Sequence, residues 1–319
     1  MSQKPLLIVN PNAGGGRAGR VFSELRPVIE GALGAVDVAF TDRAGHGVDV
    51  AEAAAREGRP TVVAVGGDGT LNEVVNGVLR GVAARPAPTK VGFIGQGTGG
   101  DFRRTLGVEH RLDRYLEVIA RGRERTVDVG LVKFVDGQGV RGERYFINIL
   151  SAGMGGLVDR YVADASRLLG PTAAYFGASL KALVAIERGR LVARVEGGAA
   201  SGGRDERLAT FMIAVCNGRF FGSGMQVAPM ADIADGRLEV VSMGGDSKLG
   251  FFTTHVRAIY QGTHLEKPGT VHFGCQRIAF ELENARDAAA TFLLDCDGEP
   301  IGGLPAEIEI VPAALTLYA

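Results

Sequence analysis

Sulfur ligands, paired histidines and excess charge are scarce in this sequence of 319 residues. The three cysteines, Cys216, Cys275 and Cys296, are odd in number, lie in or near apolar runs and lack zinc-binding spacing. This pattern favours reduced thiols in a cytoplasmic protein over a disulfide framework. None of the five histidines has a histidine partner four residues away, so we assign them no chemical role. The formal net charge of -1 argues against nucleic acid as a partner.

Long apolar runs are also missing, so no membrane-spanning segment is predicted. The run from Leu6 to Val9 is too short for a signal peptide, and the uncharged stretch from Leu168 to Leu180 is broken by Gly170 and Pro171. The length and the hydrophobic content of 46% suit two domains with a core each. We therefore expect a globular cytoplasmic protein.

The most informative segment that is present runs from Val62 to Glu73. A β-branched run leads into Gly66-Gly67-Asp68-Gly69-Thr70, and a helical pattern follows. Glycines after a buried strand allow close backbone approach, and the first amides of a helix favour an anion. Asp68 would repel bare phosphate, so its presence suggests that Mg²⁺ accompanies the ligand. A tight turn that binds nothing is the alternative from spacing alone.

Two patterns divide the chain near residue 130. Up to that point strands and helices alternate, which predicts a parallel sheet covered on both faces. The expected strands are 6–9, 36–40, 61–65 and 90–94, and the expected helices are 20–33, 48–56, 72–79 and 112–119. Beyond it, alternating apolar runs predict an antiparallel sandwich with helical insertions at 157–187 and 247–261. Its expected strands are 126–134, 144–150, 191–195, 208–215, 237–243, 277–282, 291–294 and 306–311.

Two further glycine loops follow strands of the predicted parallel sheet, at residues 10–19 and 95–102. Both contain the pattern G-x-G-x-x-G, but the first lies too far from its strand, and a helix instead of a strand with a terminal acid follows the second. These departures argue against a dinucleotide fold. Because loops after parallel strands meet at one sheet edge, three such loops with Asp68 and Asp101 favour a single ligand site there.

Two acidic turns lie in the second half of the chain. Asp232 and Asp235 precede Gly236 at a spacing that could surround one hard cation. Asp297 and Glu299 follow an apolar strand, where a carboxylate could accept a proton from an alcohol. Spacing alone leaves a solvated turn and an ordinary Asp-Gly hairpin turn as alternatives.

In this order the motifs resemble the diacylglycerol kinase catalytic-domain family, in particular soluble bacterial lipid kinases related to sphingosine and ceramide kinases. The likeness covers nearly the whole chain: residues 10–14 resemble the family's Asn-Pro-x-x-Gly, 66–70 its Gly-Gly-Asp-Gly-Thr, 97–102 its Gly-Thr-x-x-Asp-Phe and 297–299 its Asp-Gly-Glu. The resemblance implies an α/β ATP-binding domain over residues 1–130, joined by 306–319, and a β-sandwich lipid-substrate domain over 131–305, an architecture shared with NAD kinase.

The resemblance also implies residue roles. It implies ATP contacts from Asn10, Pro11, Asn12, Ala13, Gly14, Thr41, Gly66, Gly67, Asp68, Gly69, Thr70, Leu71, Asn72, Thr98 and Asp101, with Asp68 and Asp101 near the nucleotide-bound Mg²⁺. It implies a catalytic turn with Asp297 as general base beside Glu299. A structural Mg²⁺ would be held by Asp232, Asp235 and the Arg237 carbonyl, with Asp128 linking it to the active site.

The reaction implied is transfer of a phosphoryl group from ATP to a hydroxyl of diacylglycerol or phosphatidylglycerol. With no spanning segment, the protein is expected to meet this lipid transiently at the membrane surface, through apolar and basic residues of 157–187. A homodimer is one option for its assembly.

Three positions depart from the family pattern. Gln96 replaces a proline, Gly100 an asparagine, and Arg17 stands where lysine is common. Two alternatives stay open. An NAD kinase-like enzyme would share the Asp68 loop but is not expected to carry both acidic turns. A nucleotide- or lipid-binding regulatory protein with an impaired site is the other.

Overall fold

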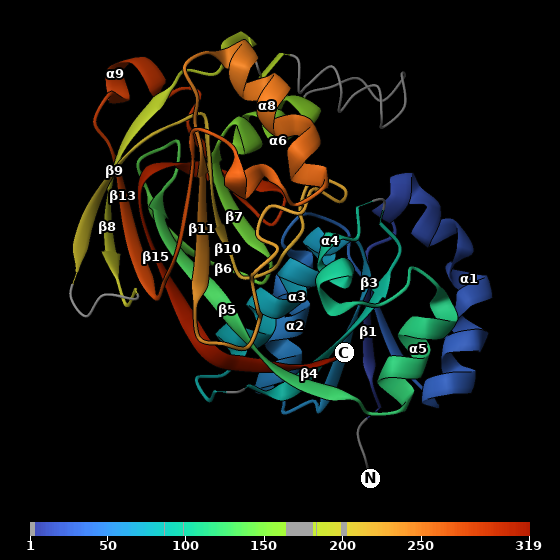
Figure 1. Cartoon of the computed structure of the whole chain (residues 1–319). Helices are drawn as coiled ribbons and strands as arrows, with labels where there is room; N and C mark the ends of the chain where they lie inside the picture. The colour runs from blue at the N-terminus through green and yellow to red at the C-terminus, as the bar shows by residue number, and fades with distance from the viewer. Residues whose placement is uncertain (1–3, 86, 98, 164–180, 183, 199–202) are drawn as a thin grey trace.

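The N-terminal part of the chain alternates strands with helices around a parallel sheet (Figure 1). In this computed structural model, residues 4–85, 87–97, 99–163, 181–182, 184–198 and 203–319 are described. The parallel strands follow the order β4-β3-β1-β2. They are β1 (Leu6–Val9), β2 (Asp37–Phe40), β3 (Thr61–Gly66) and β4 (Ala87–Gly95). The helices between and after them are α1 (Ala13–Leu33), α2 (His46–Arg56), α3 (Asp68–Gly81), α4 (Asp101–Leu106) and α5 (Leu112–Ala120).

Helices cover both faces of this sheet, which explains its apolar strands. α2 packs on α3 on one side, while α1 packs on α5 on the other (Figure 1). Every residue of β3 is buried, so the run from Val62 to Val65 has no alternation of polar and apolar positions. The continuous apolar run in the sequence is thus the signature of a strand covered twice.

The C-terminal part is built mainly from antiparallel strands. They are β5 (Glu124–Val135), β6 (Arg141–Phe146), β7 (Ile149–Gly153), β8 (Gly189–Glu196), β9 (Arg204–Thr210), β10 (Met212–Cys216), β11 (Leu238–Met243), β12 (Thr270–Cys275), β13 (Arg277–Leu282), β14 (Leu293–Cys296) and β15 (Glu299–Tyr318). The accompanying helices are α6 (Met154–Ala163), α8 (Lys248–Tyr260), the 3-10 turn η2 (His264–Glu266) and α9 (Ala285–Ala288). Together with the parallel sheet, this arrangement confirms the predicted fold class.

Several strand boundaries differ from the prediction. The range 144–150 is split into β6 and β7, because the N–H groups of Ile147 and Asn148 turn towards Asp297 instead of a neighbouring strand. The range 208–215 is likewise split into β9 and β10 at Phe211. Strand β12 was not predicted, and His272 and Gly274 interrupt its apolar pattern.

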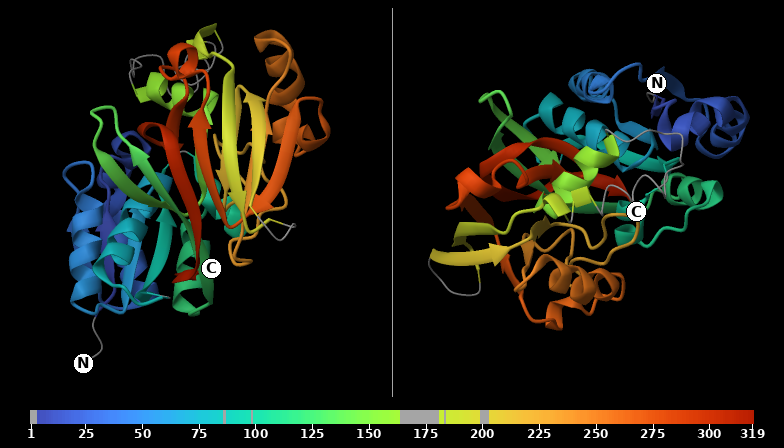
Figure 2. Two further views of the ribbon diagram at one scale, coloured as in Figure 1. Left: turned by 90° about the vertical axis from the view of Figure 1, so that its left-hand side faces the viewer. Right: turned by 90° about the horizontal axis from the view of Figure 1, so that it is seen from above.

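Strand β15 joins the two parts of the molecule (Figure 2). It pairs antiparallel with β14, β13 and β5 and parallel with β4. Leu315 and Leu317 are the residues of β15 that lie opposite β4. Both β5 and β15 cross the expected domain limits at 130/131 and 305/306, so those limits stay a prediction. One sheet therefore continues from the parallel strands into the antiparallel ones.

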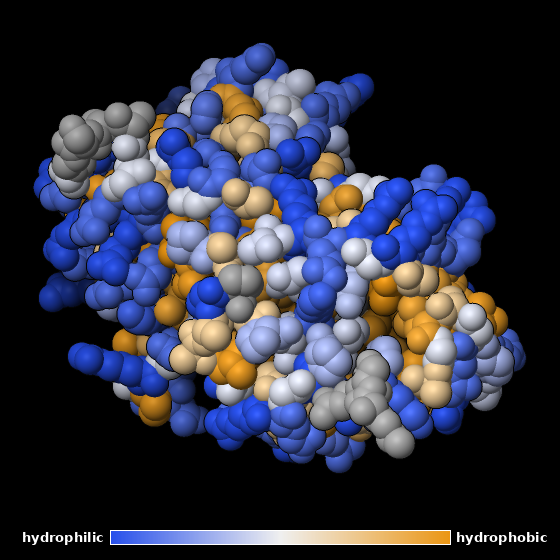
Figure 3. Space-filling view, turned by 90° about the horizontal axis from the view of Figure 1, so that it is seen from below, coloured by the Kyte–Doolittle hydropathy of each residue, from blue (hydrophilic) through white to orange (hydrophobic). Residues whose placement is uncertain are grey.

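One face of the molecular surface is shown in the space-filling view (Figure 3). Seen from below, it is largely hydrophilic, with smaller apolar areas between polar side chains (Figure 3). Within the described ranges, no helix is both long and apolar enough to cross a bilayer. Of the insertion expected at 157–187, residues 164–180 and 183 lie outside the described residues, so its predicted membrane contact is not tested.

Candidate active site

The three glycine loops meet at one edge of the parallel sheet. At the end of β1, the Asn10 side-chain amide donates to the Thr70 hydroxyl at 3.2 Å. After β4, the Gln96 N–H donates to the Gly66 carbonyl at 2.6 Å. These bonds join the ends of β1, β3 and β4, as expected for loops that follow parallel strands.

Glycine is needed where these loops touch. A Cβ at Gly97 would lie 2.6 Å from the Cα of Gly67, and a Cβ at Gly14 would lie 2.7 Å from the carbonyl oxygen of Gln96. Gly14 also has a φ of 61°, in the left-handed region that favours glycine. The edge is therefore a surface of closely packed backbone, the kind that can approach a phosphate.

Asp68 and Asp101 lie together on this edge. Asp68 accepts the N–H groups of Asp101 at 3.1 Å and of Phe102 at 3.3 Å, and so caps the start of α4. Asp101 pairs with Arg104 at 2.7 Å and accepts the Ser223 N–H at 2.8 Å. Burial raises the pKa of Asp101, and the charge of Asp68 adds to the rise. Adjacent hard-oxygen donors of one charge fit a divalent cation.

The other residues predicted to contact ATP lie in several environments. The Asn12 N–H donates to the Asn10 side chain at 2.9 Å, in the loop that holds Pro11 and leads into Ala13, the first residue of α1. Thr41 is buried after β2, and its N–H donates to Val9 at 2.9 Å. The Leu71 side chain is buried in the core. Gly69 and Asn72 lie in the first turns of α3, and Thr98 lies outside the described residues.

Asp297 is held by four hydrogen-bond donors in the turn between β14 and β15. One carboxylate oxygen accepts the Ile147 N–H and the Asn72 amide, each at 2.8 Å, and the other accepts the N–H groups of Asn148 at 3.0 Å and Ile149 at 2.8 Å. Burial raises the pKa of Asp297 to about 6, although these donors oppose the rise. The side chain is thus a fixed carboxylate that can take up a proton near neutral pH.

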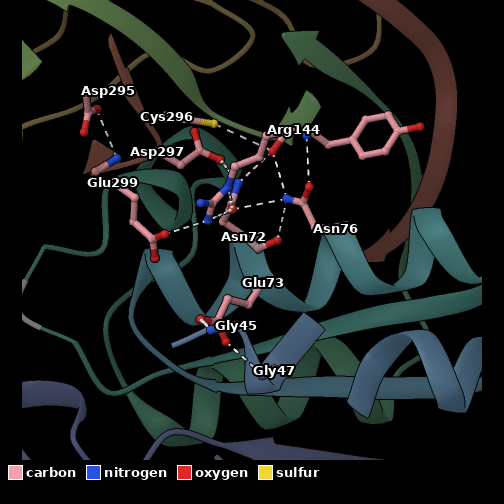
Figure 4. Close-up of polar contacts among 12 residues, drawn as sticks. Gly45, Gly47, Asn72, Glu73, Asn76, Arg144, Asp295, Cys296, Asp297 and Glu299 are labelled. Atoms are coloured by element: carbon pink, nitrogen blue, oxygen red, sulfur yellow. Dashed lines mark hydrogen bonds and ion pairs between the residues drawn. The ribbon is translucent and has the colours of Figure 1, made fainter. Parts of the chain in front are cut away.

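A polar network surrounds this carboxylate (Figure 4). Arg144 donates twice to the Asn72 carbonyl oxygen, at 3.1 and 2.7 Å, and pairs with Glu299 at 2.7 Å. A Cβ at Gly69 would lie 3.3 Å from Glu299, so Glu299 stands at the start of α3. The network therefore joins the turn that carries Asp297 to the helix that follows the Asp68 loop.

Sequence reasoning missed three polar residues of this region. Asn76, one helical turn after Asn72, donates to the Tyr145 carbonyl at 2.9 Å and accepts the Tyr145 N–H at 3.0 Å. Glu73 accepts the N–H groups of Gly45 at 2.7 Å and Gly47 at 2.9 Å, where α2 begins. Arg144 is the third. The spacing of Asn72 and Asn76 was an available signal, because side chains four residues apart share a face of a helix, and both lie buried in α3.

The acidic turn that carries Asp232 and Asp235 is an oxygen-rich loop beside β5. Asp232 pairs with Arg125 at 2.6 Å, and Asp235 accepts the Arg237 N–H at 3.0 Å. Burial raises the pKa of Asp235, and the charges of Asp232 and Asp128 add to the rise. In the part of the chain that the structure describes, no three His, Cys, Asp or Glu side chains are arranged as a metal site. The donor chemistry fits Mg²⁺, and the metal stays a prediction.

Asp128 is connected with the backbone that holds Asp297. Its two carboxylate oxygens accept the Gly236 and Ala313 N–H groups, each at 2.7 Å. The amide of Asn217, a further residue that sequence reasoning missed, donates to the Asp128 carbonyl at 3.0 Å and to the Ile147 carbonyl at 2.7 Å. The acidic turn and the amides that hold Asp297 therefore share one hydrogen-bond chain.

Comparison with known proteins gives the family. Residues 4–132 match the diacylglycerol kinase catalytic domain, and residues 148–319 match the YegS C-terminal NAD kinase beta sandwich-like domain. The "Probable lipid kinase YegS-like" of Chromohalobacter salexigens is 31% identical over 286 residues, which cover 88% of this chain and 83% of that protein. The "Probable lipid kinase YegS" of Escherichia coli O127:H6 is 26% identical, with coverage of 88% and 85%.

A solved structure supports the same fold. The crystal structure of a diacylglycerol kinase from Bacillus anthracis superposes with a TM-score of 0.68 at 20% identity, over 99% of this chain and 96% of that one. The sequence matches, taken with a carboxylate fixed beside a glycine-lined sheet edge, identify the chemistry as phosphoryl transfer from a nucleotide. This chain therefore belongs to the diacylglycerol kinase catalytic-domain family and is a lipid kinase.

Proposed function

We propose that this lipid kinase transfers the γ-phosphoryl group of ATP to a hydroxyl of a diacylglycerol-like lipid, diacylglycerol or phosphatidylglycerol, with Asp297 as general base. The observation that carries the proposal is the fixed Asp297 carboxylate. It is buried, ionises near neutral pH, and is tied through Asn72 to the helix that follows the glycine loop.

The proposed step begins with ATP phosphates against the backbone of the loops after β1, β3 and β4. Asp297 removes the proton from the lipid hydroxyl, whose oxygen attacks the γ-phosphorus as the bond to ADP breaks. Fixed donors at the edge orient the phosphates, and positioning supplies most of the rate.

Two acidic groups would hold Mg²⁺ in this proposal. Asp68 and Asp101 would hold the ion that accompanies ATP, which when bound neutralises charge on the phosphates. Asp232, Asp235 and the Arg237 carbonyl would hold a structural ion, with Asp128 as the link to the active site. The kinase would act in the cytoplasm and meet its lipid at the membrane surface.

Transfer of labelled phosphate tests the proposal. Wild-type enzyme, Asp297→Asn and the exposed control Asp205→Asn are supplied with labelled ATP, Mg²⁺ and, separately, diacylglycerol, phosphatidylglycerol, ceramide, sphingosine or NAD. We expect a labelled glycerolipid from wild type and Asp205→Asn, and a loss of about 10²- to 10⁴-fold in Asp297→Asn.

Each other outcome identifies an alternative. Labelled NAD would favour the NAD kinase-like enzyme, and label in ceramide or sphingosine would change the lipid class. No labelled product from any acceptor would favour a regulatory protein with an impaired site. Full activity of Asp297→Asn would exclude Asp297 as the base.

A further inference from the structure

Arg144 is a charged residue of the network for which the proposed reaction has no role. It lies on β6, its side chain is 20% exposed, and its partners come from both sides of the catalytic turn. Asn72 belongs to α3 and Glu299 to the start of β15. A single guanidinium therefore contacts two elements that are far apart in sequence.

The geometry of these contacts is that of a fork. Arg144 Nε and Nη2 both donate to Asn72 Oδ1, at 3.1 and 2.7 Å, while Nη2 also pairs with Glu299 at 2.7 Å (Figure 4). The opposite end of the Asn72 amide, Nδ2, donates to Asp297 at 2.8 Å and to the Tyr145 carbonyl at 2.9 Å. The Asn72 amide is therefore held from both ends.

We propose that Arg144 is a positioning residue for phosphoryl transfer, which fixes the Asn72 amide in the orientation that donates to Asp297 and which keeps Glu299 beside the catalytic turn. The inference rests on the proposed role of Asp297 as base. Arg144 does not touch the reacting atoms in this scheme and acts through Asn72.

Asn72 needs such a partner because its amide can point two ways. If the amide were reversed, its oxygen would face the Asp297 carboxylate, and two acceptors would meet without a proton between them. Two donors from Arg144 and one from Asn76, at 3.1 Å, exclude that orientation by occupying the oxygen. Lysine would keep the charge, but it has no planar pair of donors for one oxygen.

Arg144 also affects the charge around Asp297. The titratable groups near this turn are Glu299 on β15, Cys296 and Asp295 on β14, and Arg144 on β6. Burial raises the pKa of Cys296 well above its usual value, so the thiol stays neutral. Arg144 is the cation of this group, and its removal would leave Glu299 without its counter-charge. The proton of Asp297 would then be harder to remove.

Kinetics of four full-length variants test the inference with the lipid acceptor labelled by wild type. Arg144→Met removes the fork and the charge, Arg144→Lys keeps the charge, Asp297→Asn removes the base, and Arg141→Met changes an exposed arginine on the same strand. We expect kcat of Arg144→Met to fall by about 10²-fold, as for a misplaced catalytic group, with little change in KM for ATP. Arg144→Lys should recover part of this loss, and Arg141→Met should match wild type.

Two further readouts separate positioning from simple stability. The acid limb of the rate profile should move to higher pH in Arg144→Met and stay near that of wild type in Arg144→Lys. The double variant Arg144→Met with Asp297→Asn should be no slower than Asp297→Asn alone, because both changes act on the same base.

The possible failures are distinct. Wild-type kcat in Arg144→Met, or losses that add in the double variant, would overturn the inference while an inactive Asp297→Asn still supports the proposed function. Activity in Asp297→Asn equal to wild type would overturn both. If Arg144→Met does not fold, Arg144→Lys decides: wild-type kcat in that variant contradicts a need for the fork, and a reduced kcat at an unchanged melting temperature supports it.

Discussion

Acidification should switch off the enzyme through Asp297. A general base acts only when ionised, and burial raises the pKa of Asp297 to about 6. One pH unit below that value, about a tenth of the molecules carry the ionised base, so kcat/KM should fall about tenfold for each further unit. With an ordinary aspartate as base, this acid limb of the rate profile would lie near pH 4, about two units lower.

Initial rates of phosphoryl transfer to the lipid, measured against pH at constant ionic strength and saturating Mg²⁺, give the limb directly. Asp297→Asn should lose the limb along with most of the rate, whereas Asp205→Asn should keep both. The reasoning is refuted if wild type shows its limb near pH 4 while the protein stays folded, or if Asp297→Asn retains the limb near 6.

The raised pKa of Asp297 also makes the free energy of unfolding depend on pH. The folded-state pKa of Asp297 lies above the value of about 3.9 for an unfolded aspartate, so the folded chain holds this proton more tightly. Below about pH 4 this proton adds up to about 3 kcal/mol to the free energy of unfolding. The contribution is lost as the pH rises through about 6. Urea denaturation at several pH values should show that the free energy of unfolding falls over this pH range in wild type but not in Asp297→Asn. Equal pH slopes would contradict the raised pKa.

Four other changes test the surrounding structure. Gly97→Ala should raise KM for ATP about tenfold, because the new Cβ meets Gly67 and displaces the loops, and an unchanged KM would show that the edge tolerates movement. Glu73→Gln should lower the free energy of unfolding by about 1 kcal/mol through weaker bonds to the start of α2, and equal urea midpoints would argue against that role. Asp128→Asn leaves one acceptor oxygen for two N–H groups and should lower the free energy of unfolding by about 1–3 kcal/mol in the same assay. An unchanged free energy of unfolding would argue against a role of these bonds in stability. Chelation of divalent cations should stop transfer and added Mg²⁺ should restore it, whereas activity in chelator would remove Mg²⁺ from the proposal.

The fold class could be predicted because burial leaves a plain pattern in parallel strands. The run from Val62 to Val65 is apolar at every position since helices cover both faces of its sheet. The antiparallel part was harder to divide. The sequence pattern predicts one strand over residues 144–150, yet the backbone amides of residues 147–149 turn towards Asp297. Asp297 lies 148 to 150 residues later in the chain, so the local sequence pattern does not reveal this contact.

The site was predictable to the extent that its residues are unusual types in their segments. Glycines and acids after apolar strands mark the loops at Asp68, Asp101 and Asp297, and the bonds from the Asp101 and Phe102 N–H groups to Asp68 show that two of these loops meet. Arg144 and Asn217 carry no such mark. Arg144 lies within β6 and Asn217 directly after β10, and the importance of each depends on partners about 70 residues or more away.

Asp297, the proposed base, lies at the junction of the two parts, and this position affects how the candidate active site forms. Asp297 takes one donor, Asn72, from the N-terminal α/β part and three backbone amides from the segment that begins β7. The three amides reach both carboxylate oxygens, and Asn72 adds a second donor to the oxygen that the Ile147 N–H contacts. Each donor favours the ionised form of a buried carboxylate. Strand β15 maintains the junction, because it carries Glu299 at one end and pairs with β4 through Leu315 and Leu317 near the other. Docking of the two parts therefore brings the fourth donor, Asn72, to Asp297 and, in the proposed mechanism, favours the ionised form that transfer needs.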